Sequence, residues 1–244
     1  MRLDRALVAR GLAESRTRAQ ALIAAGAVRV AGHPATRPAQ MVAEEVELTL
    51  AGDPMPWVSR GALKLLHALE QFDLSPEGME ALDLGASTGG FVEVLLARGA
   101  ARVHALDVGR GQLHPRIAAD PRVVRWEGVN ARDLPADLPA PEWVTADLSF
   151  ISLTLALPPA LDRAALGATL VALVKPQFEV GREAVGRGGV VRDAEAQAAA
   201  CVRVRARVAE AGWAVLGEVE SPITGGDGNR EFLLAARKEG SAKG

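Results

Sequence analysis

Apolar runs of about five residues recur from residue 81 to residue 236, and segments with helical spacing separate most of them. Such an alternation is typical of a mainly parallel sheet with helices on both faces. The predicted strands are 81–85, 102–107, 122–126, 143–147, 169–175, 213–219 and 230–236. The pattern therefore predicts a doubly wound α/β fold with a seven-stranded sheet, in which the last two strands can run antiparallel.

A smaller unit precedes this sheet. Residues 2–10 carry apolar side chains on one helical face, and Ser15 is suited to cap a second helix. Short alternating runs at 28–30 and 42–50 predict two strands. We therefore expect a small α+β domain at residues 1–50.

Two prolines, Pro54 and Pro56, disfavour helix between the two units, so the connection is expected to be a semi-stiff linker. Ser59 is expected to cap the helix that follows. The predicted division of the chain is a domain at 1–50, a linker at 51–60, a body at 61–237 and a disordered tail at 238–244.

Charge separates the same units. The chain has a net charge of −2, but residues 1–40 contain seven Arg and two acids. A basic unit on an acidic body is typical of a polyanion-binding module, although a solvated helical face would have the same charge. We find neither a membrane-spanning run nor a secretion signal, and the single Cys201 suits a reducing compartment. We therefore expect a cytoplasmic protein without a membrane partner.

The first strand of the body leads into a loop of small residues, which reads Asp-Leu-Gly-Ala-Ser-Thr-Gly-Gly-Phe over 83–91. Glycine lets a backbone approach a ligand closely. Asp107, at the end of the next strand, is placed to accept hydrogen bonds from a ribose. This pattern predicts S-adenosylmethionine as cofactor, with contacts from Asp83, Gly85, Ser87, Thr88, Gly89, Gly90, Phe91, Asp107, Asn130 and Asp147.

A dinucleotide-binding domain is the rival interpretation of this loop. The G-x-G-x-x-G spacing of such domains is not matched by Gly85, Gly89 and Gly90. Asp83, Asp107, Asp147 and Lys175 each stand at or near the end of a predicted strand. Because ligands bind beyond the carboxyl ends of parallel strands, we expect these four residues at one site.

The first fifty residues resemble the RNA-binding domain named after ribosomal protein S4. The resemblance rests on Leu3-Asp4, Leu7, 11–16, Ala19, Leu22-Ile23, 26–28, Val30 and Gly32. It implies that arginines near the second helix contact phosphates, and we assign this role to Arg5, Arg16 and Arg18.

Nearly the whole chain resembles the TlyA family of rRNA 2′-O-methyltransferases, also known as haemolysins. The resemblance rests on Trp-Val-Ser-Arg-Gly at 57–61, Asp-Leu-Ser-Phe-Ile-Ser at 147–152 and Lys-Pro-Gln-Phe-Glu at 175–179. In order, Lys64, Asp147, Lys175 and Glu231 match the Lys-Asp-Lys-Glu tetrad of ribose 2′-O-methyltransferases. The resemblance implies a Rossmann-like class I methyltransferase fold behind an S4-type domain, and no metal.

By this resemblance Lys175 steers or deprotonates a ribose hydroxyl, while Asp147 and Glu231 hold the two amines in place. Lys175 can act as a base only if its pKa falls, through burial or the second cation Lys64, and the two acids oppose that fall. Taken alone, Lys64 would be interpreted as a surface lysine whose stem lies on the core. We also assign RNA contacts to Arg60, Arg182 and Arg187, the last two in a Gly-rich segment at 181–190 expected to be a mobile flap. Phe178 can stack on a flipped base or pack in the core.

Three hypotheses follow for the function. The first is an rRNA ribose methyltransferase that binds ribosomal subunits as a monomer. The second is a membrane-active haemolysin, and the third is a ribosome-assembly factor that has lost catalysis. An intact tetrad favours the first, but the sequence does not show which nucleotide or which subunit is modified.

Overall fold

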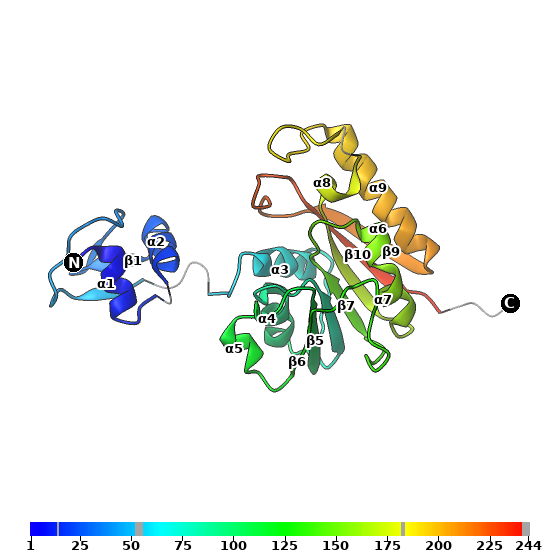
Figure 1. Cartoon of the computed structure of the whole chain (residues 1–244), viewed down its shortest axis with the longest axis horizontal. Coiled ribbons are helices and arrows are strands. Elements are labelled where there is room, and N and C mark those ends of the chain that lie inside the picture. Colours follow the sequence, from blue (N-terminus) through cyan, green and yellow to red (C-terminus); the bar gives the residue numbers. More distant parts are fainter. Residues whose placement is uncertain (14, 52–55, 182–183, 241–244) are drawn as a thin grey trace. The chain divides into compact units, whose positions relative to one another are not determined.

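The computed structural model describes residues 1–13, 15–51, 56–181 and 184–240. The chain forms two compact units, Met1–Pro56 and Trp57–Gly244 (Figure 1). Their boundary along the sequence falls within the segment predicted as a linker. Residues 52–55 of that linker, residues 182–183 of the Gly-rich segment, which include Arg182, and residues 241–244 of the predicted tail lie outside the described residues.

The N-terminal unit packs two helices on a small antiparallel sheet. Its elements are α1 (Leu3–Ala9), α2 (Arg16–Ala24), β1 (Val28–Val30), β2 (His33–Pro34) and β3 (Leu48–Leu50), with β1 in the centre of the sheet. The Oγ atom of Ser15 accepts a hydrogen bond from the backbone of Arg18, which confirms the predicted cap of α2. Apolar side chains of both helices and of the sheet form a core of their own.

The strand predicted at 42–50 is shorter than expected, because only its last three residues pair with β1. The guanidinium of Arg10 donates hydrogen bonds to backbone carbonyls of Ala43, Glu44 and Val46. These carbonyls face a side chain and not a neighbouring strand, so the alternating pattern alone was misleading here.

The second unit is a seven-stranded sheet with helices on both faces. Its strands are β4 (Glu80–Leu84), β5 (Arg102–Asp107), β6 (Val123–Glu127), β7 (Trp143–Ala146), β8 (Thr169–Val174), β9 (Trp213–Glu220) and β10 (Phe232–Lys238). Its helices are α3 (Gly61–Gln71), α4 (Gly90–Ala97), α5 (Pro115–Ala118), α6 (Leu153–Ala156), α7 (Pro158–Arg163), α8 (Pro176–Glu179) and α9 (Ala194–Glu210).

The strand order is β6-β5-β4-β7-β8-β10-β9, and β10 is antiparallel to both of its neighbours. The other pairs are parallel. Strand order therefore reverses at β4, the place where doubly wound sheets bind ligands. All seven predicted strands are present, and the predicted fold class is confirmed.

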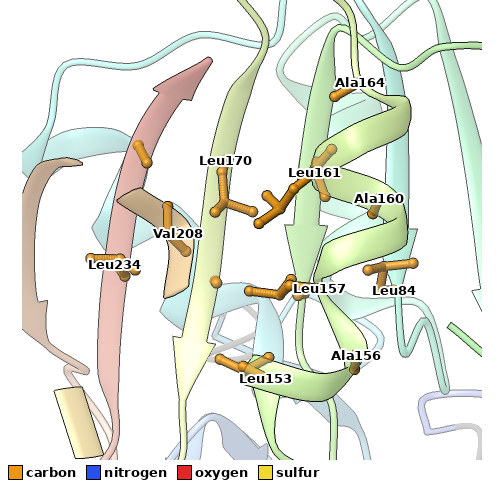
Figure 2. Packing of buried hydrophobic residues seen from close by; sticks show 14 of the residues in the cluster. Leu84, Leu153, Ala156, Leu157, Ala160, Leu161, Ala164, Leu170, Val208 and Leu234 are labelled. Atoms are coloured by element: carbon orange, nitrogen blue, oxygen red, sulfur yellow. The ribbon is translucent and has the colours of Figure 1, made fainter. Parts of the chain in front are cut away.

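Two apolar clusters cover the two faces of this sheet. One cluster joins the sheet to α6, α7 and α9, and Figure 2 shows Leu157 and Leu161 of the helical segment against Leu170 of β8. The other joins it to α3 and α4. β8 is buried along its whole length, as a central strand covered on both sides should be.

Two expectations at the ends of the body were wrong. Ser59 does not cap α3, which begins after Arg60 without a side-chain cap. The hydroxyl of Ser59 instead lies against the start of α4, because a Cβ on Gly90 would be 2.1 Å from Ser59 Oγ. Lys238, assigned to the tail, is the last residue of β10, and its Nζ atom donates to the carbonyls of Leu161, Asp162 and Ala164. None of the helices described is long and apolar enough to cross a membrane.

Candidate active site

The four residues of the predicted tetrad come together at the edge where the parallel strands end. Asp147 follows β7 and Lys175 follows β8. Glu231 immediately precedes β10, whose opposite direction brings its beginning to the same edge. Lys64 reaches the site from α3, and its Nζ atom lies 2.6 Å from Glu231 Oε2.

The tetrad is arranged as two ion pairs. Lys64 with Glu231 forms the first, and Lys175 with Asp147, whose Nζ and Oδ1 atoms are 2.7 Å apart, forms the second. Both lysines are 8% exposed and Glu231 is 3% exposed, so these are not the surface ion pairs that an isolated Lys64 would suggest. A buried charge of this kind depends on its partner, because its removal leaves the other charge without compensation.

The Lys175–Asp147 pair, unlike the Lys64–Glu231 pair, has no hydrogen bond between its two partners. Lys64 donates a hydrogen bond to Glu231, whereas Asp147 Oδ1 is buried without a hydrogen bond of suitable geometry despite its short distance to Lys175. Lys175 instead donates to the Oγ atom of Ser149 at 2.8 Å. The contact of Lys175 with Asp147 is therefore mainly electrostatic, and the ammonium is shared between a carboxylate and a hydroxyl.

The glycines of the 83–91 loop are required by close contacts. Gly85 has a φ of +84°, and a Cβ there would lie 2.5 Å from the carbonyl oxygen of Asp147. Gly89 has a φ of +95° and would meet Leu113 at 2.9 Å. A side chain at either position would push this loop away from its neighbours, which explains the small residues.

Two cavities open beside this loop. The larger, of about 560 Å³, contains the side chains of Lys64, Asp147 and Lys175. The smaller, of about 320 Å³, has Asp107 at one side and a largely apolar wall. Gly85, Ser87, Asp147 and Ser149 line both, so the two cavities adjoin beside Asp147 of the tetrad.

These cavities fit S-adenosylmethionine. Leu106, Val108, Val129 and Leu148 give the smaller cavity the apolar wall that an adenine needs. The two carboxylate oxygens of Asp107 accept backbone hydrogen bonds from Ser87 and Gly109, at 2.8 and 2.7 Å. Each oxygen keeps a second lone pair, so a ribose diol can still donate to it. The Gly-rich loop would then hold the amino-acid end of the cofactor.

Asp83 differs from the other residues expected at the cofactor. It is 1% exposed and is absent from the described lining of both cavities. Thr145 donates to its Oδ1 atom at 2.7 Å, and Oδ2 has no hydrogen-bond partner. Burial raises the pKa of Asp83 to about 7, and the nearby carboxylates of Asp147 and Asp107 add to this effect. Any influence of Asp83 on the cofactor is therefore indirect, through the loop.

The remaining cofactor residues lie around the cavities. Gly90, Thr88 and Phe91 line the larger cavity with Ser87. Asn130 is exposed, and its Oδ1 atom accepts a hydrogen bond from the backbone of Arg132. Its neighbours Val129 and Ala131 line the smaller cavity, whereas Asn130 is not among the lining residues described. Its contact with adenine stays a prediction.

The arginines expected to contact RNA are in different situations. Arg60 lines the larger cavity and donates to the carbonyl of Thr224 at 3.5 Å. Arg187 and Arg5 are exposed. Arg16 is exposed as well, but its Nε atom lies 2.8 Å from Asp4 Oδ2. These assignments remain predictions, and Arg16 is held by a partner that its helical position did not reveal.

Asp4 is the centre of a network in the N-terminal unit. Its side chain is fully buried and accepts hydrogen bonds from Arg2, Arg16 and Gln20. These hydrogen bonds, first of all that from Arg2, hold the pKa of Asp4 well below its ordinary value. The side chains of Arg2 and Arg16 stay 38% and 50% exposed, so Asp4 holds two cationic side chains that still reach solvent.

Hydrogen bonds with Asn229 hold the C-terminal end of the Gly-rich segment at 181–190. The side chain of Asn229, 1% exposed, accepts a hydrogen bond from the backbone of Val191 and donates to the carbonyl of Gly189. Whether the segment moves over RNA stays a prediction. Phe178 is half-buried and its ring lies 5.3 Å from that of Phe150, which is 92% exposed.

Several lining residues were missed by the sequence analysis. Ser59, Ser149, Ile223 and Thr224 line the larger cavity. A signal existed for Ser149, two residues after Asp147 in a motif already noted. Ile223 and Thr224 precede Glu231 in a loop with no recognisable pattern, and only the tertiary structure brings them to the site.

A seven-stranded sheet that reverses at β4, with a donor cavity beside a pair of buried lysines, defines a methyltransferase that uses S-adenosylmethionine. The comparisons with known proteins agree. The FtsJ-like methyltransferase family matches residues 57–238, and the S4 domain family matches residues 1–48.

Relatives at high identity narrow this further. The 16S/23S rRNA (cytidine-2′-O)-methyltransferase TlyA of Mycobacterium tuberculosis is 49% identical over 98% of this chain and 90% of its own length. The putative rRNA methyltransferase YqxC of Bacillus subtilis is 45% identical, over 96% and 84%. The structure of a putative hemolysin from Streptococcus thermophilus superposes with a TM-score of 0.76 at 41% identity, over 99% and 89%. The chain belongs to the FtsJ-like methyltransferase family and, within it, to the TlyA group.

Proposed function

We propose that this protein methylates the ribose 2′-hydroxyl of cytidines in ribosomal RNA, with S-adenosylmethionine as donor, and that its S4 domain anchors it on the RNA. The observation that carries the proposal is the Lys64–Glu231 and Lys175–Asp147 arrangement where the two cavities adjoin. The similarity to the M. tuberculosis rRNA (cytidine-2′-O)-methyltransferase supports it.

The chemistry explains why two buried lysines suit this acceptor. A ribose hydroxyl is a weak nucleophile, and the enzyme must place its oxygen in line with the methyl group. When bound, S-adenosylmethionine supplies a methyl group on a positively charged sulfur, which is already activated for attack. Lys175 steers the hydroxyl or takes its proton, and Asp147 and Glu231 keep the two amines in place.

The N-terminal unit supplies the affinity for RNA. Its arginines are held at the surface, and phosphate contacts of this kind are independent of sequence. Arg5, Arg16 and Arg18 are the proposed contacts of this unit. Arg60 and Arg187 of the second unit add to them, and Arg182 extends the set outside the described residues. We further propose that the enzyme is a monomer and binds its ribosomal subunit in the cytoplasm.

Transfer of a radiolabelled methyl group to isolated ribosomal subunits tests this function. The purified protein is incubated with labelled S-adenosylmethionine and either subunit, and the labelled nucleotide is mapped. We expect label on a ribose 2′-oxygen of a cytidine. Label on a base would overturn the ribose assignment, and intact cofactor binding without transfer to either subunit would favour the assembly factor.

The similarity to the S. thermophilus protein described as a hemolysin is the reason to test a second function, lysis of membranes. The same preparation is added to phospholipid vesicles loaded with a fluorescent dye. Release of dye by the purified protein, at concentrations where methyl transfer is absent, would favour the haemolysin.

A further inference from the structure

Ser149 occupies the junction between the two cavities of the active site. It is exposed and lines both cavities together with Gly85, Ser87 and Asp147. Gly85 has no side chain, and the carboxylate of Asp147 only accepts hydrogen bonds. Ser87 and Ser149 therefore both have a hydroxyl where the donor side and the acceptor side of the site meet, and Ser149 is the one that accepts a hydrogen bond from Lys175.

The contact with Lys175 orients this hydroxyl. Lys175 Nζ donates a hydrogen bond to Ser149 Oγ at 2.8 Å, so one lone pair of the oxygen is occupied. The hydroxyl proton is directed away from an ammonium that itself only donates. A hydroxyl that accepts a hydrogen bond from a cation is also a stronger donor. Ser149 thus offers a polarised O–H group to whatever enters the cavity.

The backbone around Ser149 is fixed on both sides. The amide of Asp147 donates to the carbonyl of Leu84, and the amide of Leu153 donates to Glu179 Oε1 at 2.7 Å. Between them Phe150 has a φ of +65°, a conformation that a bulky side chain rarely adopts. Strain of this kind persists where the surrounding structure imposes it. The orientation of Ser149 is therefore built into the fold.

We propose that Ser149 is a substrate-binding catalytic residue, whose hydroxyl donates a hydrogen bond to a ribose or phosphate oxygen of the acceptor nucleotide and holds its ribose against Lys175. This inference rests on the proposed methylation of a ribose. Ser149 then joins the four residues of the tetrad as a residue that contacts the acceptor nucleotide and not S-adenosylmethionine. The expected signature is a slower transfer step with unchanged affinity for the donor.

Single-turnover methyl transfer to isolated ribosomal subunits tests the proposal with three variants. Ser149→Ala removes the hydroxyl and should slow transfer by about 10- to 100-fold, the range for a lost hydrogen bond to a charged or strongly polarised group. Ser149→Thr keeps the O–H group and should recover the rate to within about threefold of wild type. Ser152→Ala is the matched control in the same loop, because Ser152 bonds to Glu179 and lies outside the described lining.

Binding of S-adenosylhomocysteine, measured by calorimetry, is a readout that does not depend on turnover. Both Ser149 variants should bind it within about twofold of wild type, and a loss of about tenfold would make Ser149 a donor-pocket residue and overturn the proposal. Equal slowing of transfer in Ser149→Ala and Ser149→Thr, or in Ser152→Ala, would also overturn it, since loop geometry would then be the cause.

The two proposals fail in different ways. If wild type transfers methyl groups to ribose and Ser149→Ala is as fast as wild type, only the role of Ser149 is overturned. If wild type transfers none to either subunit, the proposed function is overturned together with the role of Ser149.

Discussion

Buried carboxylates in the two units of this protein are treated in opposite ways. In the N-terminal unit, Asp4 is surrounded by two guanidiniums and an amide, and its pKa is held well below the ordinary value. In the body, Asp83 has one hydroxyl as hydrogen-bond donor, and burial raises its pKa to about 7. Burial alone therefore assigns no role to an acid; the groups placed around it decide whether it stays charged.

The difference extends to what each unit does with charge. The N-terminal unit pairs its charges so that cations still face solvent, which suits a polyanion. The body pairs its lysines inside a cavity, where they can act on one hydroxyl. Substitutions in the body should therefore change the rate of transfer, and substitutions in the N-terminal unit should change affinity.

The largest effect is expected for Lys175. Lys175→Ala removes the group that we propose steers or deprotonates the ribose hydroxyl, so transfer should fall by about 10²- to 10⁴-fold. Cofactor binding should persist, because the apolar wall and Asp107 are untouched. Single-turnover assays and calorimetry measure the two quantities. Transfer at the wild-type rate would show that the assignment of roles within the tetrad is wrong.

A smaller effect is expected in the N-terminal unit. Arg16→Ala combined with Arg18→Ala should weaken binding to ribosomal subunits by about tenfold. The slope of the logarithm of the binding constant against the logarithm of the salt concentration should become shallower by about one to two. The rate at saturating RNA should not change. Arg98→Ala, a surface arginine of the body near Glu70, is the matched control. An unchanged salt slope would remove both residues from the RNA interface.

Asp4→Asn tests whether the buried carboxylate holds the N-terminal unit together. Since the folded pKa of Asp4 is lowered, its stabilising effect is present above its unfolded value of 3.8 and is lost as the pH falls below it. At pH 7, α1 and α2 should therefore exchange amide hydrogens faster in the variant, after correction for intrinsic rates. The difference should narrow below about pH 4. A pH-independent difference would point to packing instead of charge.

The smallest effect is expected for Asp83→Asn. The folded pKa of Asp83 lies above the unfolded value, so the folded state binds the extra proton, and wild-type stability should decline as the pH rises from about 4 to about 7. The variant stays neutral, so its melting temperature relative to wild type should be higher at pH 8 than at pH 5. Thermal unfolding at the two pH values measures this, and an unchanged difference contradicts it. Donor affinity, measured alongside, reports whether Asp83 acts through the loop on the cofactor.

Local patterns predicted the body better than the N-terminal unit. Strands such as β8 are buried on both faces, and a continuous run of apolar residues from Leu170 to Val174 leaves few alternatives to a central strand. The segment 42–50 instead has an alternating pattern that also predicts a strand, but its carbonyls bind Arg10, more than thirty residues away. The cap expected at Ser59 failed for a similar reason, because its hydroxyl lies against Gly90.

The sequence by itself determined the class of fold and the position of the loop of small residues at 83–91, because both depend on short spacings and on the rule that parallel strands end at one edge. The resemblance to ribose 2′-O-methyltransferases pointed to the tetrad, whose roles stay a prediction. Only the tertiary structure decided how the charges are shared. It paired Lys64 with Glu231, 167 residues apart, gave Lys175 a hydroxyl as well as a carboxylate, and placed Arg16 on Asp4. Pairing in a folded chain depends on distance and burial in three dimensions, and neither is written in the order of the residues.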